Sequence, residues 1–178
     1  MRQISVPQVG VFMALFVLVL LLAAGTSHWG LGSLPLGDFR GVVLLLGGVV
    51  AMYLWAFVAY RLFLKAMPLA EGELEPGSRA EFAAQVNILF YLLLFNTLIR
   101  THFLPVPLMR LVSLALGARL GPNTSSAGTL LDPPLIEFGA NCIIGHDAVL
   151  YAHAIEGSRF ALARIRIGAG VTIGAMAV

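Results

Sequence analysis

The amino-acid sequence predicts a membrane protein in two parts, an N-terminal transmembrane α-helical hairpin with interfacial helices and a C-terminal array of short stacked β-strands. Three observations lead to this prediction. The 178 residues are 59% hydrophobic and only 11% charged, which is far from the composition of a soluble domain. Two long apolar stretches lie near the N-terminus, and bulky apolar residues recur with a period of six in the last third of the chain.

Composition and charge also exclude several classes of protein. High hydrophobicity with sparse charge is incompatible with a disordered chain, and the 19 glycines follow no three-residue period of the collagen type. The eleven Lys and Arg residues are scattered singly, so no stripe of positive charge could follow a phosphate backbone. Cys142 is the one cysteine and has no second thiol for a disulfide or a metal site. We therefore predict no nucleic-acid partner and no metal.

Residues 1–66 are predicted to form two transmembrane helices. Residues 9–24 are uninterruptedly apolar and, with their flanks, are long enough to cross the hydrocarbon core of a bilayer. A cleavable signal peptide is the alternative, because small residues follow at 23–25. Residues 41–64 form a second apolar stretch, with Arg40 before it and aromatic and cationic residues at its end, as expected near lipid headgroups. The second stretch favours a helical hairpin.

The next two segments are more polar. Residues 67–81 contain several Glu residues with Pro and Gly, so we predict a polar cytoplasmic loop. Residues 82–116 are apolar but carry Asn, Gln and Arg, and form either interfacial helices or a third membrane helix. With two crossings, Arg40 alone faces the outer side among the Lys and Arg residues up to 119, which favours the interfacial alternative. We expect an integral protein of the bacterial cytoplasmic membrane, with its C-terminal part on the cytoplasmic side.

Residues 117–178 carry the six-residue repeat. One position in each six-residue unit is usually a large apolar residue, and in several units a glycine follows it. Ser126 and Asp132 fall at this position but are neither large nor apolar. One large inward residue beside a glycine suits a short strand that turns and stacks on the next, so that each layer covers the one below. The bulky position is held by Leu120, Phe138, Ile144 and Leu150 and, after a slip, by Ile167 and Ile173.

These motifs resemble those of the hexapeptide-repeat acyltransferases. The resemblance covers about the last third of the chain, in Leu-Gly-Ala-Arg-Leu-Gly-Pro-Asn at 116–123, Asn-Cys-Ile-Ile-Gly-His at 141–146 and Ile-Gly-Ala-Gly-Val-Thr-Ile-Gly-Ala-Met-Ala-Val at 167–178. It implies a left-handed parallel β-helix with three six-residue units in each coil. The last unit ends at Val178 without a cap, so we expect a β-helix that is truncated at its C-terminus and a fragment that can be inactive alone.

The resemblance also implies an activity, the transfer of an acyl group from acetyl-CoA or a similar thioester to an amine or hydroxyl. In the family a histidine upstream of a closing Ile-Gly pair is the general base, and His153 matches it. Acyl transfer needs a base with a pKa near neutrality and a donor to the oxyanion, and imidazole suits the first role. Glu156 is expected to orient His153, an exposed loop carboxylate being the alternative. His146 is the alternative base.

The repeat register supports a site in this region. From Leu150 to Ile167 is seventeen residues, one short of a full coil, so the segment that contains His153 must leave the regular path. Loops of this kind often carry function. Cys142 falls at a small inward position of the repeat, which predicts a packed core thiol rather than a nucleophile.

The family resemblance implies coenzyme A as the acyl donor, held in a groove between the subunits of a homotrimer. Gly168, Gly174 and Ala175 match the positions whose backbone holds the pantetheine arm. Arg164 and Arg166 are candidates for the nucleotide phosphates by charge alone. The membrane hairpin places the site near lipid, which suggests a lipid-linked, polymer-linked or small hydrophobic acceptor.

Other functions remain open at this stage. A non-catalytic, membrane-anchored trimerisation or scaffold module is favoured by Ser126 and Asp132 at bulky positions. The run 104–157 also resembles the C-terminal membrane region of single-module peptide synthetases, which implies an amide-forming domain that uses a carrier-bound aminoacyl thioester. A channel or transporter subunit is poorly supported, because neither predicted span has an ionisable residue at its centre.

Overall fold

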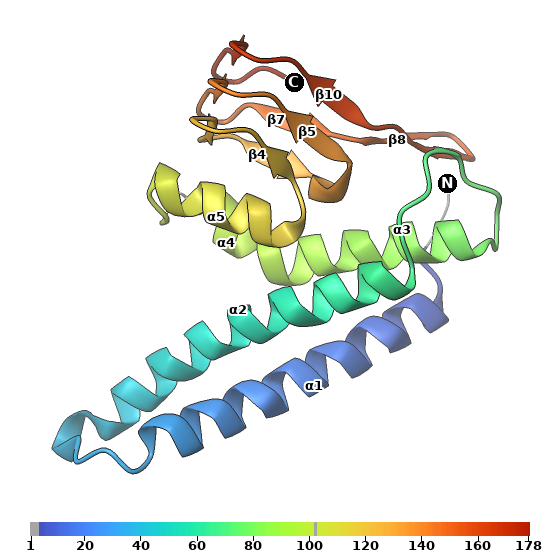
Figure 1. The fold of residues 1–178 in the computed structure, drawn as a ribbon. Coiled ribbons are helices and arrows are strands. Elements are labelled where there is room, and N and C mark those ends of the chain that lie inside the picture. The colour runs from blue at the N-terminus through green and yellow to red at the C-terminus, as the bar shows by residue number, and fades with distance from the viewer. Residues whose placement is uncertain (1–3, 102) are drawn as a thin grey trace.

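The computed structural model describes residues 4–101 and 103–178, in which long apolar helices are followed by small sheets (Figure 1). Helices α1 (Val6–Leu31) and α2 (Arg40–Ala66) form an antiparallel hairpin, joined through the short 3₁₀ helix η1 (Gly37–Phe39). Both are long and apolar enough to cross a membrane, and most of their side chains are exposed, as expected for a surface that faces lipid. The predicted hairpin is confirmed to this extent.

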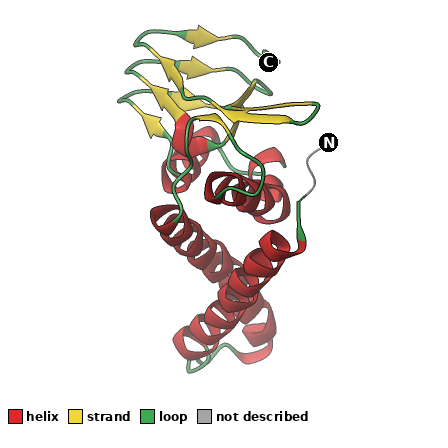
Figure 2. Ribbon diagram, turned by 90° about the vertical axis from the view of Figure 1, so that its right-hand side faces the viewer, coloured by secondary structure: helices red, strands yellow, loops and turns green. Residues whose placement is uncertain are grey.

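A third apolar helix lies between the hairpin and the sheets (Figures 1 and 2). It consists of α3 (Arg79–Phe90), a π-helical segment η2 (Tyr91–Phe95) and α4 (Asn96–Arg100). It is also long enough to cross a membrane, but 61% of its apolar window is buried inside the protein. The length of this helix fits a third crossing, and its burial fits a helix that lies against the other two.

The start of α3 has a local cause in the sequence. The Ser78 hydroxyl accepts a hydrogen bond from the Glu81 backbone N–H at 3.1 Å, and Glu81 Oε2 accepts one from the Gly77 N–H at 2.6 Å. These contacts satisfy N–H groups that a helix start leaves unpaired. The helix consequently begins at Arg79, before the expected position 82. Helix α5 (Val106–Leu116) follows and ends at Gly117, whose φ of 106° suits a helix terminus.

Most of the strands after α5 form three stacks, in each of which the strands are parallel. In two of them three layers are in register, through Leu120, Phe138 and Ile167 in the first and Ser126, Ile144 and Ile173 in the second. The first stack holds β2 (Arg119–Leu120), β5 (Ile136–Phe138) and β10 (Ile165–Ile167); the second holds β3 (Ser125–Ser126), β6 (Ile143–Ile144) and β11 (Thr172–Ile173); the third holds β4 (Thr129–Leu131) and β7 (Val149–Tyr151). Within the first two stacks the layers are 18 and then 29 residues apart.

Close stacking explains the recurring glycines. A Cβ atom on Gly121 would lie 2.5 Å from the carbonyl group of Gly139, and one on Gly139 would lie 2.6 Å from the Ala169 nitrogen. A Cβ atom on Gly145 would lie 2.5 Å from the Ala175 nitrogen. Such distances are shorter than van der Waals contact, so a side chain is excluded wherever the next layer covers the turn.

The repeat breaks for the first time after β4. Leu130 pairs with Leu150, 20 residues away rather than 18, so Asp132 does not take the inward position that the six-residue count gives it. Asp132 instead adopts a left-handed conformation with φ 56°, and the 3₁₀ helix η3 (Pro133–Leu135) follows it. Asp tolerates this conformation better than most residues, since its short side chain can bond locally.

The second break is an antiparallel hairpin, at the place where the register predicts an excursion. It consists of β8 (His153–Glu156) and β9 (Arg159–Leu162), with β1 (Gly72–Glu73) of the polar loop added to its edge. Leu74 of that loop packs against Phe160 and Leu162 in a small apolar cluster. The polar segment before α3 therefore lies against the sheets.

Two larger cores complete the fold. The helical core is an aromatic cluster in which the ring of Tyr60 lies 5.4 Å from that of Phe90 and 5.5 Å from that of Phe95. The sheet core lies between the stacks and contains Ile136, Ile144 and Cys142. The Cys142 side chain is fully buried there, so its prediction as a core residue is confirmed.

Candidate active site

His153 meets a buried carboxylate where the two breaks in the repeat come together. Its Nδ1 lies 2.5 Å from Oδ2 of Asp132, and the Asp132 side chain is only 3% exposed. A carboxylate with both oxygens as acceptors requires hydrogen on Nδ1, because a neutral imidazole has one N–H donor and one acceptor nitrogen. Nε2 is then the acceptor nitrogen, and it has no hydrogen-bond partner among the described residues.

The second oxygen of Asp132 is bound from the helical part. Asn87 of α3 donates its side-chain N–H to Asp132 Oδ1 at 2.7 Å. The hydroxyl of Tyr60 in α2 donates to the Asn87 carbonyl oxygen, also at 2.7 Å. Three buried side chains thus form one hydrogen-bond chain, which ends at His153. It links the helical hairpin, the middle helix and the sheets.

A cavity of about 310 Å³ opens beside this pair. His153 and Asp132 line it from the sheet side, and residues of α3, η2 and α4 line it from the opposite side. The remaining lining residues are Ile88, Tyr91, Leu92, Asn96, Arg100, Leu131 and Ile155. The cavity is therefore mostly apolar with a few polar side chains, which is the usual character of a small-molecule site.

The π-helical turn shapes one wall of this cavity. It widens the helix between α3 and α4, so that Tyr91 and Leu92 line the cavity while Leu94 and Phe95 are buried in the helical core. The Tyr91 hydroxyl is buried and has no hydrogen-bond partner among the described residues. A buried donor without a partner costs free energy, and π turns are frequent at functional sites.

The electrostatic environment favours protonation of His153. The hydrogen bond and negative charge of Asp132 raise the pKa of the imidazole above its ordinary value, and partial burial opposes this rise. The same carboxylate would stabilise an imidazolium that forms when the ring takes a proton. His153 is consequently suited to accept a proton from a bound acceptor.

Two other expected site residues lie elsewhere. Glu156 lies in register with Arg159 on the neighbouring strand of the antiparallel hairpin, and it is exposed. The carboxylate that binds His153 is therefore Asp132 rather than the expected Glu156. His146 lies in the turn after β6, where its Nδ1 is 2.9 Å from Asp147, and it does not line the cavity.

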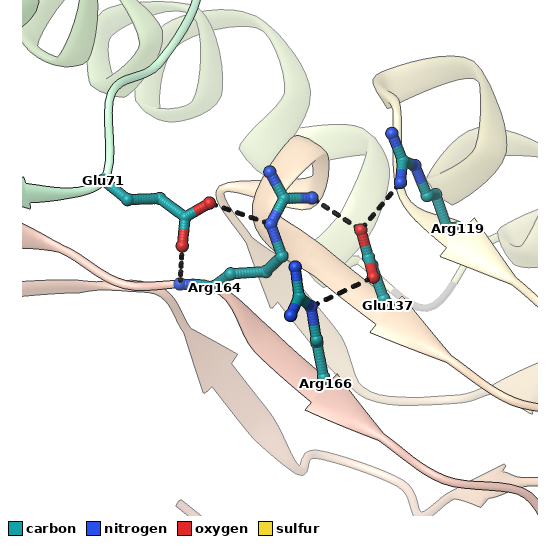
Figure 3. A network of polar contacts seen from close by, with 5 residues as sticks. All are labelled: Glu71, Arg119, Glu137, Arg164 and Arg166. Carbon is teal, nitrogen blue, oxygen red and sulfur yellow. Dashed lines mark hydrogen bonds and ion pairs between the residues drawn. The ribbon is translucent and has the colours of Figure 1, made fainter.

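Figure 3 shows the two arginines expected at nucleotide phosphates in a network of ion pairs on the outer face of the first stack. Arg164 binds Glu71 at 3.0 Å and Glu137 at 2.5 Å, so its guanidinium already has two carboxylate partners. Arg166 is 74% exposed and lies 3.4 Å from Glu137, which Arg119 also binds. The Arg164 hydrogen bond is the main cause that holds the pKa values of both Glu71 and Glu137 below their ordinary range.

The residues expected along the pantetheine arm share the outermost layer of the stacks. Gly168 follows β10, and Gly174 and Ala175 follow β11. A Cβ atom on Gly168 or Gly174 would meet nothing within 4 Å, unlike one on the glycines a layer below. These residues thus present accessible backbone.

A larger cleft than this cavity lies away from the histidine. It has a volume of about 790 Å³ and lies between α1, α2 and the start of α3, with almost entirely apolar walls. None of His153, Asp132 and Asn87 lines it. Within residues 4–101 and 103–178, no cluster of three or more His, Cys, Asp and Glu side chains could hold a metal ion.

Sequence reasoning missed three residues of this site: Asp132, Asn87 and Tyr60. Asp132 carried a signal, since it broke the six-residue repeat just before two prolines. Asn87 carried a weaker one, as an amide within an apolar helix. Tyr60 was interpreted only as an aromatic residue near lipid headgroups.

Comparison with protein-family models, with curated proteins and with solved structures finds no match to this chain.

Proposed function

We propose that this protein is a membrane-anchored acyltransferase, which moves an acyl group from a thioester to an amine or hydroxyl with His153 as general base. The observation that carries the proposal is the His153–Asp132 pair at the wall of a cavity. A histidine with Nδ1 on a buried carboxylate and Nε2 free is the arrangement that removes a proton from a nucleophile. The acceptor would bind in this cavity.

The proposed reaction uses residues on both walls of the cavity. His153 Nε2 takes the proton of the acceptor N–H or O–H while the acceptor atom attacks the thioester carbonyl carbon. The C–S bond then breaks, and the imidazolium returns the proton to the departing thiolate. Asp132 stabilises the imidazolium between these steps. The Tyr91 hydroxyl, buried without a partner, is the candidate donor to the oxyanion.

The fold that we propose for the C-terminal part is a left-handed parallel β-helix. Successive strands belong to successive stacks, in the order β2, β3, β4 and again β5, β6, β7. The first two layers of two stacks are 18 residues apart, which is the length of three six-residue units. On the basis of the family resemblance we also propose a homotrimer, in which grooves lie between neighbouring β-helices.

The proposed acyl donor is acetyl-CoA or a similar acyl thioester. The accessible backbone at Gly168, Gly174 and Ala175 supports a groove for the pantetheine arm in the outermost layer. Arg166 is the better candidate for the nucleotide phosphates, because it is exposed and has one long contact. Arg164 would have to exchange a carboxylate for a phosphate.

The membrane hairpin suggests where the acceptor comes from. The cavity lies against the third apolar helix, so a lipid-linked or hydrophobic acceptor could reach it from the bilayer surface. We propose that the sheets face the cytoplasm. Labelling in a Cys142→Ser background would test this orientation. A cysteine at Ser33 should react with an impermeant maleimide on intact cells, whereas a cysteine at Glu75 should react only after the membrane is opened.

The activity is tested by thiol release from acetyl-CoA and from longer acyl-CoA thioesters, with the full-length protein in detergent and a panel of amine and sugar acceptors. His153→Gln should lower kcat at least about a hundredfold, the usual contribution of a general base. Asp132→Asn should lower kcat about tenfold or more, because the imidazole loses its orienting partner. His28→Gln, at the far end of α1, is the matched control and should retain full turnover.

Three results would count against the proposal. Turnover that survives in His153→Gln would exclude His153 as the base. Turnover lost in His146→Gln but kept in His153→Gln would transfer that role to the exposed histidine. If the wild-type protein turns over no donor, including a carrier-bound thioester, the scaffold module becomes the better explanation.

A further inference from the structure

The hydrogen-bond chain behind His153 begins on a helix long and apolar enough to cross the membrane. Tyr60 lies on α2 and is only 2% exposed, with its ring held between Phe90 and Phe95. Asn87, on the middle helix, is 3% exposed. Neither residue lines the cavity, so any effect on the base would pass through Asp132.

The choice of residue types at these positions points to a polar role. The two rings in contact with that of Tyr60 belong to Phe90 and Phe95, and the rings that contact these two in turn are those of Phe12, Phe57 and Phe63. A phenylalanine at position 60 would fill nearly the same space, and a buried hydroxyl costs free energy unless it is bonded. The Tyr60 hydroxyl gives one hydrogen bond, to Asn87. Packing alone therefore does not explain a tyrosine.

The direction of each hydrogen bond is fixed by the next one. The Asp132 carboxylate accepts hydrogen bonds, so Asn87 must turn its NH₂ group toward it. The Asn87 carbonyl then faces Tyr60, and a carbonyl accepts only from a donor such as the phenol hydroxyl. With Oδ1 of Asp132 occupied by Asn87, Oδ2 remains for Nδ1 of His153. The chain thus permits one orientation of the carboxylate and one tautomer of the imidazole.

We infer that Tyr60 and Asn87 are positioning residues, which hold Asp132 so that a helix of the membrane hairpin sets the orientation and tautomer of His153. This inference rests on the proposed role of His153 as base for its consequence in catalysis. The contacts span three parts of the fold, at 2.7 Å, 2.7 Å and 2.5 Å. A shift of α2 or α3 would therefore be felt at the imidazole.

Few other groups could produce the same effect on His153. Among residues 4–101 and 103–178, the titratable side chains that line its cavity, besides Asp132, are Tyr91 and Arg100. The ring of Tyr151, on β7, lies 5.8 Å from the imidazole. The variants below leave all three in place, so a change in His153 would come from the chain through Asp132.

The test measures His153 directly by ¹⁵N NMR of histidine-labelled protein in nanodiscs, with His153→Gln to assign its signal. In Tyr60→Phe and in Asn87→Leu, the pKa of His153 should fall toward its ordinary value and the Nδ1–H tautomer should lose population. Ser27→Ala is the matched control, since it also removes a buried hydroxyl that bonds between α1 and α2. This control should leave His153 unchanged.

A second variant pair tests whether the effect passes through Asp132. In an Asp132→Asn background, Tyr60→Phe should cause no further change in the His153 titration. If Asn87→Leu does not fold, Tyr60→Phe alone tests the inference. This substitution removes a single oxygen atom and its hydrogen bond to Asn87, so the packing of the ring is kept. A His153 titration and tautomer that are unchanged in Tyr60→Phe would overturn the inference.

The inference and the proposed function fail in different ways. Where turnover is found, Tyr60→Phe should lower kcat with KM unchanged, and Asn87→Leu should lower it about tenfold. If the wild-type protein has no turnover, the proposed function fails, and the NMR measurement still decides whether α2 and α3 position the imidazole. If Tyr60→Phe changes KM but leaves the NMR signal of His153 unchanged, this result would also contradict the inference.

Discussion

The regular layers of the stacks and the place where the repeat breaks are built on different physical rules. In the regular layers, backbone lies so close to backbone that Gly121, Gly139 and Gly145 leave no space for a side chain. At the break, Asp132 leaves the stack and its two carboxylate oxygens are held by hydrogen bonds from Asn87 and His153. The first region depends on shape between neighbouring layers. The second depends on polar contacts between parts distant in sequence.

This difference teaches where function can reside in such a fold. A layer whose turns tolerate only glycine has no freedom to present chemistry, because each layer is fixed by the next. The break releases one carboxylate from the repeat and inserts a hairpin that begins with His153. Departures from a regular pattern are often functional for this reason.

The largest expected effect comes from the polar side of the comparison. Asp132→Ala should lower the free energy of unfolding by about 3 kcal/mol, because it leaves the Asn87 amide buried without an acceptor and His153 without its carboxylate. SDS titration of the protein in micelles measures this change. Asp147→Ala is the matched control, since Asp147 has nearly the same backbone, φ 57° against 56°, but is exposed.

The two variants separate the polar network from the left-handed backbone. Asp147→Ala removes a residue that tolerates positive φ. It also removes an exposed contact with His146, which contributes little to stability. If both variants cost the same, the backbone conformation rather than the network stabilises the break.

The steric side of the comparison should give the next largest effect. Gly139→Ala should lower the free energy of unfolding by about 2 kcal/mol, the usual cost of overpacking against backbone that cannot easily move. Gly168→Ala is the matched control, because Gly168 lies at the same position of the repeat one layer farther out. A Cβ atom there meets nothing within 4 Å. This variant should leave unfolding unchanged. Equal costs at the two positions would show that stacking does not select glycine.

The pH dependence of stability should distinguish the two regions as well. The pKa of His153 is raised in the folded state, so its contribution is fully present below the unfolded pKa, about 6.5, and is lost as pH rises through the folded pKa. Thermal unfolding by circular dichroism from pH 5 to 9 should therefore show a fall in stability on the alkaline side. Asp132→Asn should remove this fall, and Gly139→Ala should retain it.

The smallest expected effect concerns the ion pairs on the outer face of the first stack (Figure 3). The pKa values of Glu71 and Glu137 are lowered, so their contribution is present above the unfolded pKa, about 4.3, and is lost as pH falls through the folded pKa. Arg164→Gln should weaken this acid sensitivity and its salt dependence in thermal unfolding. Arg166→Gln, with one long contact, should change little.

The sequence anticipated the helical hairpin, the break near His153 and the burial of Cys142 because each depends on neighbouring residues. Apolar length predicts a membrane helix, and the six-residue count shows where the repeat fails. The count could not tell which carboxylate joins His153. Glu156 was chosen as the nearer acidic residue along the chain, but an antiparallel hairpin carries it away from the imidazole to face Arg159.

The sequence by itself determined the helical segments, their approximate ends and the choice of His153 as the candidate base. Tertiary structure alone decided the partners of that histidine. Asp132 lies 21 residues before His153, and Asn87 lies 45 residues before Asp132, so no local pattern relates them. Their contact requires α3 to lie between the hairpin and the sheets. Hydrogen bonds act over about 3 Å, and only the packed fold brings such distant side chains within that distance.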